Sequence, residues 1–404
     1  MILAEATIRV KHTIDNRDNK LLIVISFKDF EASNLAMLRS FNLKNFRCFQ
    51  NFTLEPLERV NLIAGKNNVG KTSLLEAIFI FINPTKPESL FQINRLRGIS
   101  RSSRFLDIEE LRGFFFDQDI DKVIELSSLE ENEVQRSLQI RLDKQEKNRR
   151  EQQTLFDDDT VTYDINESLT TEIRPYDTLV LEYNDPNRKK DFLRISLPAD
   201  GRLTADGRLL LGRYRRERFS LGIYLTTSTR SPKEDAERFS NLERVGRQDE
   251  VLESLRLLEP RLQRLTLLVV DGEPIINGDI GMSQLVPLPL MGEGLGRLLS
   301  ITLAIANAKG GTILLDEVEN GLHYSVLTGV WTAIADAARR AEAQVVATTH
   351  SQECIIAAHK AFENSEKYDF RYHRLERVKD EIIRAVTYDR ETLATSDEMN
   401  LEMR

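Results

Sequence analysis

One short segment restricts the fold of this chain more than any other. The residues GKNNVGKTS match the pattern G-x-x-x-x-G-K-[ST], with Gly65, Gly70, Lys71 and Thr72 at the defining positions. The apolar run VNLIAG leads into this pattern with the length of a buried strand, and apolar residues at helical spacing follow it up to an Asn-Pro pair. A strand, glycine-rich loop and helix in this order predict a phosphate-binding loop (P-loop) in an α/β sheet.

The residue types of the loop suit a nucleotide. Glycines let backbone N–H groups wrap around phosphates, and the start of the following helix adds its positive dipole end. Lys71 is expected to reach the β- and γ-phosphates, and Thr72 to ligate Mg²⁺. The residues expected to contact ATP are Gly65, Asn67, Asn68, Gly70, Lys71, Thr72 and Ser73.

A second motif, TILLDE at residues 312–317, is an apolar run that ends in two carboxylates. In open α/β sheets, ligands bind at the carboxyl ends of the strands. Asp316 is therefore expected to hold Mg²⁺, and Glu317 to polarise the attacking water. A plain strand-to-helix junction can look the same, but beside a P-loop the pattern favours ATP hydrolysis.

His350 ends a further apolar strand, QVVATTHS. A single histidine is more often a packed or surface residue than a functional one. Its place after the strand that follows the Asp-Glu strand favours a role as a sensor of the γ-phosphate.

The chain is expected to divide into four segments. Residues 1–36 contain the strand-like run LLIVISF and are interpreted as an accessory segment. Residues 37–119 and 231–404 are expected to form the two parts of an ATPase head, because helices and strands alternate there as in a mostly parallel sheet with covering helices. Residues 120–230 are interpreted as an inserted β-rich lobe; its charged run RLDKQEKNRREQQ lacks coiled-coil heptads and favours a solvated helix or loop.

Composition restricts the partners and the cellular compartment that suit this chain. The 64 acidic and 56 basic residues give a net charge of −8, so contact with nucleic acid would have to be local. Cys48 and Cys354 match no metal-binding spacing and fit a reducing compartment. No apolar run approaches the roughly 18 residues of a membrane span, and the first residues do not resemble a signal peptide. We expect a cytoplasmic protein without membrane insertion.

In their order along the chain, these motifs resemble a known class. The P-loop, a long insertion, PLMGEGLGRLLSI, TILLDEVENGLHYS and VVATTHSQE resemble the ABC-type P-loop NTPase heads of the SMC, RecF and OLD families, and the OLD/RecF-like group, often described as AAA-type, fits best. The resemblance covers about residues 37–90 and 235–404. It implies that Gly292 and Gly294 lie in the signature loop, that residues 319–323 form the D-loop region, and that His350 is the switch histidine.

The chain departs from these families in several places. Met291 precedes the Gly-Glu-Gly where a transporter-type signature has serine, so backbone amides or another side chain would have to contact the γ-phosphate. Gln92 lies closer to Lys71 than a Q-loop glutamine should, and it is not assigned. The missing coiled coil disfavours an SMC protein, and about fifty residues after His350 are too few for a C-terminal Toprim nuclease.

Our leading hypothesis is an ATP-hydrolysing switch that forms a homodimer or larger homo-oligomer around nucleotide. It would act with a separate nuclease or effector in DNA repair or antiphage defence. One alternative is the energising subunit of a membrane transporter, and another is a module that binds ATP structurally; the presence of Asp316 and Glu317 argues against the second. The basic stretches at 95–104 and 212–219 are either solvated arginines or a weak, sequence-independent DNA contact.

Overall fold

The computed structural model describes most of the predicted head. The described residues are 10–14, 21–25, 37–84, 88–99, 105–106, 108–144, 176–186, 191–196, 203–204, 222–226, 231–378, 382–399 and 401–403.

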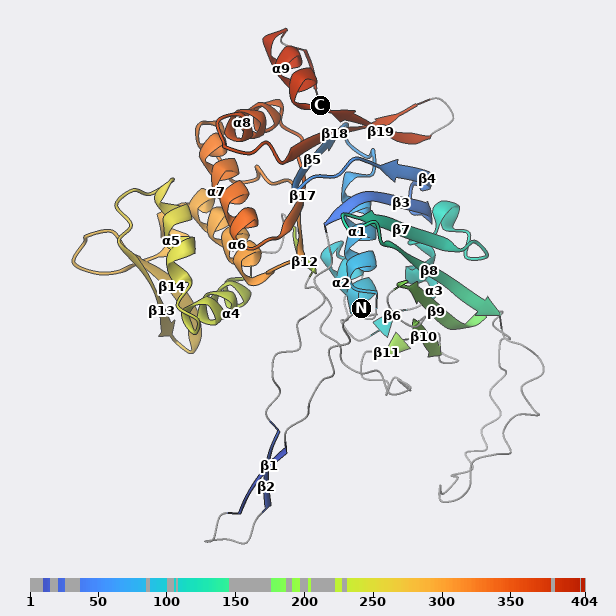
Figure 1. The fold of residues 1–404 in the computed structure, drawn as a ribbon, viewed down its shortest axis with the longest axis horizontal. Helices are drawn as coiled ribbons and strands as arrows, with labels where there is room; N and C mark the ends of the chain where they lie inside the picture. The colour runs from blue at the N-terminus through green and yellow to red at the C-terminus, as the bar shows by residue number, and fades with distance from the viewer. Residues whose placement is uncertain are drawn as a thin grey trace, which may run out of the picture.

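A six-stranded sheet forms the centre of the molecule (Figure 1), in the order β12-β16-β17-β5-β18-β19. Its neighbouring strands are parallel except for the last pair, β18 and β19. This arrangement confirms the prediction of an α/β fold with a mostly parallel sheet. The strands are β12 (Gly222–Leu225), β16 (Thr312–Leu315), β17 (Gln344–Thr348), β5 (Val60–Gly65), β18 (Phe370–Arg377) and β19 (Ile383–Tyr388).

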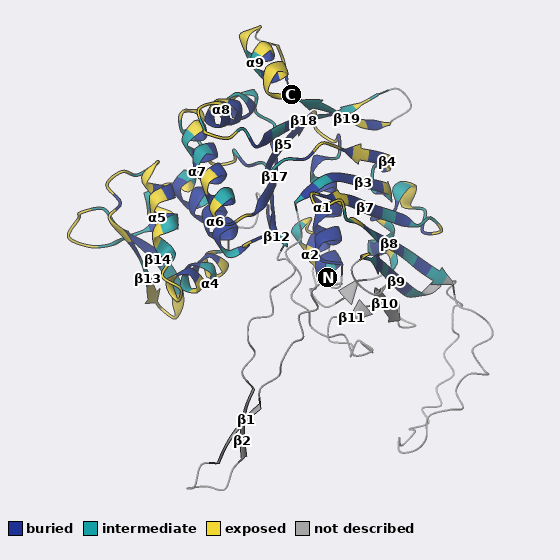
Figure 2. Ribbon diagram, viewed as in Figure 1, coloured by how far each residue is buried: buried dark blue, intermediate teal, exposed yellow. Residues whose placement is uncertain are grey.

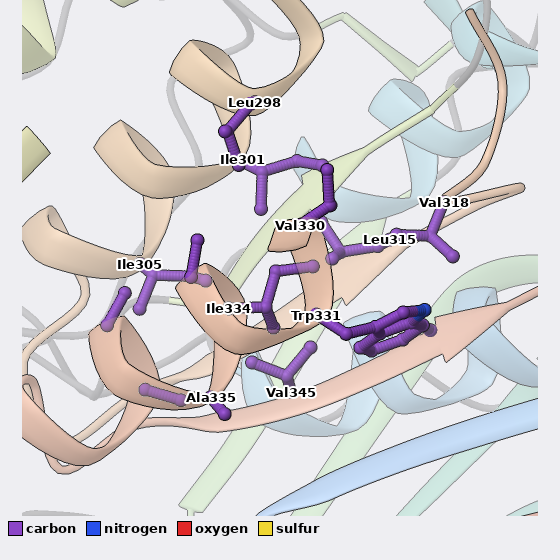
Figure 3. Close-up of a cluster of buried hydrophobic side chains, with 14 of the residues drawn as sticks. Leu298, Ile301, Ile305, Leu315, Val318, Val330, Trp331, Ile334, Ala335 and Val345 are labelled. Atoms are coloured by element: carbon purple, nitrogen blue, oxygen red, sulfur yellow. The ribbon is translucent and has the colours of Figure 1, made fainter. Parts of the chain in front are cut away.

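Both faces of this sheet are covered, as expected for strands that read as continuous apolar runs. Along β5, Val60, Leu62 and Ala64 belong to one core cluster and Ile63 to the other, which is the period-two alternation of a strand. Trp331 lies in the first cluster (Figure 3). The helices of that face are α6 (Glu293–Asn307), α7 (Leu327–Arg340) and α8 (Gln352–Glu363), and α1 (Lys71–Ile82) covers the opposite face.

An antiparallel sheet packs on the outer side of α1, in the order β10-β9-β8-β7-β3-β4. Strands that precede the P-loop in sequence thus share a sheet with strands of the segment interpreted as an inserted lobe, and β12 of that segment joins the central sheet. The strands are β3 (Leu38–Phe46), β4 (Phe49–Leu54), β7 (Ile124–Glu130), β8 (Gln135–Lys144), β9 (Tyr176–Asn184) and β10 (Asp191–Ser196).

A smaller unit packs against α6. Its hairpin turns at Asp271 and Gly272, and both residues have positive φ. Figure 2 shows that the tip of this hairpin and helix α9 are largely exposed, whereas α1 is buried. The elements of the unit are α4 (Pro232–Glu243), α5 (Gln248–Arg256), β13 (Arg264–Val270), β14 (Glu273–Asp279) and β15 (Val286–Pro287).

The remaining described elements are short or peripheral. They are α2 (Glu88–Leu96), β6 (Phe105–Leu106), α3 (Ile108–Arg112), β11 (Leu203–Thr204), α9 (Arg390–Glu398) and the 3-10 helices η1 (Phe116–Gln118), η2 (Leu288–Met291) and η3 (Tyr324–Val326). In the segment interpreted as accessory, β1 (Val10–Ile14) and β2 (Leu21–Ile25) pair with each other in a separate two-stranded sheet.

Two sequence interpretations remain to be compared with the structure: the charged run near residue 150 and the expected lack of a membrane span. The charged run at 141–153 begins as the end of β8, and residues 145–153 lie outside the described residues. None of the described helices combines the length and the apolar character that a membrane crossing requires.

Candidate nucleotide site

The P-loop connects β5 directly to α1, and its backbone requires glycine at two positions. Gly65 has φ 143° and Gly70 has φ 96°, both in the region that favours glycine. A Cβ at Gly65 would lie 2.6 Å from the carbonyl oxygen of Leu375, and one at Gly70 would lie 2.7 Å from Cys48 Sγ. No side chain caps the start of α1, so its first N–H groups are available to an anion.

Lys71 is the buried cation of the loop. Its Nζ donates to the carbonyl oxygens of Gly65 at 2.6 Å and Lys66 at 3.0 Å, which holds the ammonium against the loop. Burial lowers the pKa of Lys71 to about 8, although the carboxylates of Asp316, Glu317 and Glu319 oppose the shift. The site therefore contains a cation that is poorly solvated and suited to a new anionic partner.

Asp316 lies at the carboxyl end of β16, next to the P-loop. Thr72 Oγ1 donates to Asp316 Oδ2 at 3.1 Å, and Thr348 Oγ1 donates to Asp316 Oδ1 at 2.6 Å. Thr348 Oγ1 also accepts the backbone N–H of Glu317 at 2.9 Å. One hydroxyl from β17 thus orients both acidic residues.

Glu317 and His350 face each other beyond this point. His350 Nε2 lies 3.3 Å from Glu317 Oε1, and both side chains are partly exposed. Glu317 has φ 44°, which is uncommon for a residue with a side chain. Glu319 Oε1 accepts the backbone N–H of His350 at 2.8 Å and so fixes the end of β17 relative to the Asp-Glu pair.

The expected signature residues lie at the start of α6. Gly292 has φ 114°, and a Cβ placed there would have no neighbour within 4 Å, so this point of the loop is open. A Cβ at Gly294 would contact the carbonyl oxygen of Gly321 and the side chain of Leu322 at 3.2–3.3 Å. The structure thus brings the P-loop, the Asp-Glu pair and His350 together, and it places Gly294 against the predicted D-loop region.

Arg297 connects α6 to the end of β16, a role that the sequence reasoning did not find. It donates to the backbone oxygens of Asp316 at 2.9 Å and Thr226 at 3.1 Å. Burial lowers the pKa of Arg297, and the carboxylates of Asp316, Glu319 and Glu317 oppose that shift. In the sequence, the only signal for Arg297 is its position three residues after the Gly-Glu-Gly. The signal for Thr348 is its position two residues before His350.

A second missed cluster lies behind the P-loop helix. Arg97 Nε donates to Glu76 Oε1 at 2.5 Å, and Arg97 Nη2 donates to Ser73 Oγ at 3.2 Å. Arg47 Nε lies 2.6 Å from Glu76 Oε2, and Glu76 is buried. Arg97 belongs to the basic stretch at 95–104, interpreted either as solvated arginines or as a DNA contact, and its guanidinium is held by the buried carboxylate of Glu76 on α1.

The donors at the site fit a magnesium ion. The Thr72 hydroxyl and the Asp316 carboxylate are hard oxygen ligands within 3.1 Å of each other. Within the described part of the chain, no group of three His, Cys, Asp or Glu residues could hold a metal by itself. An ion at Thr72 and Asp316 would thus complete its coordination with water and nucleotide phosphates, as Mg²⁺ commonly does.

Comparisons with known proteins agree with this geometry. A family model described as "AAA domain, putative AbiEii toxin, Type IV TA system" matches residues 60–355. An ATP/GTP phosphatase of Helicobacter pylori is 23% identical over 334 residues, which are 79% of this chain and 86% of that protein. The DNA replication and repair protein RecF of Pseudoalteromonas translucida is 55% identical over only 42 residues, or 10% of this chain and 12% of RecF.

Solved structures offer a weaker likeness. The SMC head bound to the C-winged helix domain of ScpA is 12% identical, with a TM-score of 0.46 over 90% of this chain and all of that one. The family match spans most of the chain and includes the P-loop, the Asp-Glu pair and His350. The chain belongs to this AAA-domain family and is a P-loop ATPase of the ABC class.

Proposed function

We propose that this ATPase is a nucleotide-driven dimerisation switch, in which two copies close around ATP and separate after hydrolysis. The observation that carries the proposal is the set of contacts joining Thr72, Asp316, Thr348 and Glu317. They support a role for Glu317 as the hydrolytic carboxylate, because it follows Asp316, the expected metal ligand, and both residues share the Thr348 hydroxyl beside the P-loop.

Different residues of the site bind the phosphates and promote hydrolysis. The loop amides and Lys71 bind the phosphates, and Lys71 exchanges its two carbonyl partners for the β- and γ-phosphate oxygens. Glu317 orients the attacking water and accepts its proton. His350, whose Nε2 lies 3.3 Å from Glu317 Oε1, is the proposed sensor of the γ-phosphate. When bound, Mg²⁺ would be held by Thr72 and Asp316 and would neutralise phosphate charge.

The signature loop supports the dimerisation part of the proposal. Gly292 is open on the side where a Cβ would stand, and the first turn of α6 has no side-chain cap. Open N–H groups at a helix start are suited to an anion. Gly294 packs on Gly321 of its own chain, so we infer that Gly292 and Gly294 serve the γ-phosphate held by a second copy.

The proposal also covers the domains of the chain and the partners of the ATP-bound dimer. Residues 37–119 and 231–404 would form the ATPase head, with 120–230 supplying most of its antiparallel sheet and 1–36 an accessory segment. ATP-bound dimers would engage a separate nuclease or effector, in DNA repair or antiphage defence, and a DNA contact would be sequence-independent. The RecF likeness is consistent with the repair alternative.

Replacement of Glu317 by Gln tests the hydrolytic assignment. The amide keeps the shape of the side chain but loses the charge that orients water, so hydrolysis should slow by about a hundredfold or more while ATP binding stays close to wild type. Phosphate release and calorimetry would measure the two effects. Hydrolysis at the wild-type rate would contradict the role of Glu317.

A further inference from the structure

The last parallel strand of the central sheet, β18, contacts the P-loop at the start of the loop and again at its tip. β18 pairs with β5 so that Leu375 lies opposite Gly65, where a Cβ would lie 2.6 Å from the Leu375 carbonyl oxygen. Two residues further along, Arg377 extends beyond the end of β5. Figure 1 shows β18 beside β5, in line with this pairing.

Arg377 makes a specific contact with the tip of the loop. Its Nη2 donates to the carbonyl oxygen of Asn68 at 2.9 Å. Asn68 has φ 61°, in the left-handed region that residues with a side chain adopt less often. The charged hydrogen bond therefore holds the loop at a residue whose backbone conformation is uncommon.

The direction of this contact matters for phosphate binding. A trans peptide is planar, so the carbonyl oxygen of Asn68 and the N–H of Val69 point in opposite directions. With the carbonyl held toward Arg377, the Val69 N–H points away from β18. In a P-loop, the amides around this position are the ones that surround the phosphates.

We propose that Arg377 is a positioning residue for ATP: it fixes the Asn68–Val69 peptide so that the Val69 N–H is presented to the nucleotide phosphates. The proposal rests on the P-loop being the ATP site of the proposed switch. Arg377 does not touch the reacting atoms. Its loss should therefore weaken ATP binding without slowing the hydrolysis of bound ATP.

A matched control lies on the same hairpin. Arg384 on β19 pairs with Glu376 at 3.1 Å. Replacement of either arginine by Met removes one positive charge and the same hydrogen-bonding group. Only the Arg377 variant loses the contact with Asn68.

The experiment compares Arg377→Met, Arg377→Lys and Arg384→Met in steady-state ATP hydrolysis and in calorimetry. Arg377→Met should raise KM and Kd for ATP about tenfold, the range of a hydrogen bond from a charged donor, with kcat within about twofold of wild type. Arg377→Lys should recover part of the affinity, because an ammonium can donate to the same carbonyl. Arg384→Met should stay within about twofold of wild type.

Three outcomes would overturn the proposal. They are an unchanged KM in Arg377→Met, an equal rise of KM in both Met variants, and a fall in kcat alone. Thermal unfolding without nucleotide shows whether the variants are folded, and Arg377→Lys carries the test if Arg377→Met is not. Lys71→Ala distinguishes a failure of this proposal from a failure of the proposed nucleotide site. If Lys71→Ala binds ATP with full affinity, the P-loop is not the nucleotide site. If Lys71→Ala loses ATP affinity but Arg377→Met keeps the wild-type KM, only the role of Arg377 is wrong.

Discussion

The lowered pKa of Lys71 predicts that ATP binding depends on pH in the mildly alkaline range. Burial lowers this pKa to about 8, so the nucleotide-free site loses its positive charge as pH rises through that value. Phosphates beside the ammonium favour its charged form and raise its pKa toward or above the usual value of about 10.4. The complex therefore binds more protons than the free protein between these two pKa values, and affinity must fall as pH rises.

The size of the effect follows from the pKa. For a group that titrates at about 8, the charged fraction falls from roughly nine-tenths at pH 7 to roughly one-tenth at pH 9, so ATP affinity should fall about tenfold, or ~1.4 kcal/mol. At pH 8, binding should take up about half a proton.

Calorimetry in two buffers of different ionisation enthalpy measures this uptake directly. Lys71→Arg is the control, because arginine stays charged throughout this range and should show no such uptake. If the wild-type protein binds ATP equally well at pH 7 and pH 9, without proton uptake at pH 8, the Lys71 ammonium does not titrate in this range.

Lys71→Ala should weaken ATP binding at least about a hundredfold, because it removes the charged partner of two phosphates; calorimetry that shows unchanged binding would exclude the loop as the site. Thr348→Val should lower kcat about tenfold with little change in ATP affinity, since it removes the hydroxyl that orients Asp316 and Glu317; an unaltered kcat would contradict this role. Deletion of residues 1–36 should leave ATPase activity intact, because β1 and β2 pair with each other in a separate sheet; an inactive or insoluble product would show that the head requires them.

The central sheet could be predicted well because its signals are local. The run at 312–315 is the strand β16, and the run at 345–348 is β17 with one more residue at its start. Each is a short apolar segment bounded by polar residues or glycine, and the two pair in parallel.

The antiparallel sheet could be predicted only in part, because strand pairing between distant segments leaves little trace in a single sequence. The β-rich character of 120–230 was visible, but β7 pairs with β3, which precedes the P-loop. The hydrogen bonds that Gln344 Nε2 donates to the backbone oxygens of Leu38 and Glu58, both distant in sequence, could likewise not be predicted.

The candidate site shows the same division. Motif spacing predicted Lys71, Asp316, Glu317 and His350 as site residues. Phosphate chemistry requires these residue types, and it requires them on loops and strand ends that lie next to one another. Arg297, by contrast, donates hydrogen bonds to backbone oxygens. Every residue has a backbone oxygen, so such a contact requires no particular partner residue and leaves no pattern in the sequence. The same holds for Arg377 and the carbonyl of Asn68.

The most direct test of the switch is the assembly state of Glu317→Gln with and without ATP, measured by multi-angle light scattering. If the open signature loop around Gly292 completes the site of a second copy, slow hydrolysis should trap ATP between two chains. We expect ATP to convert the variant from monomer to dimer, and a second substitution, Lys71→Ala, to abolish the conversion. A variant that binds ATP but stays monomeric at every concentration tested would contradict the proposed switch.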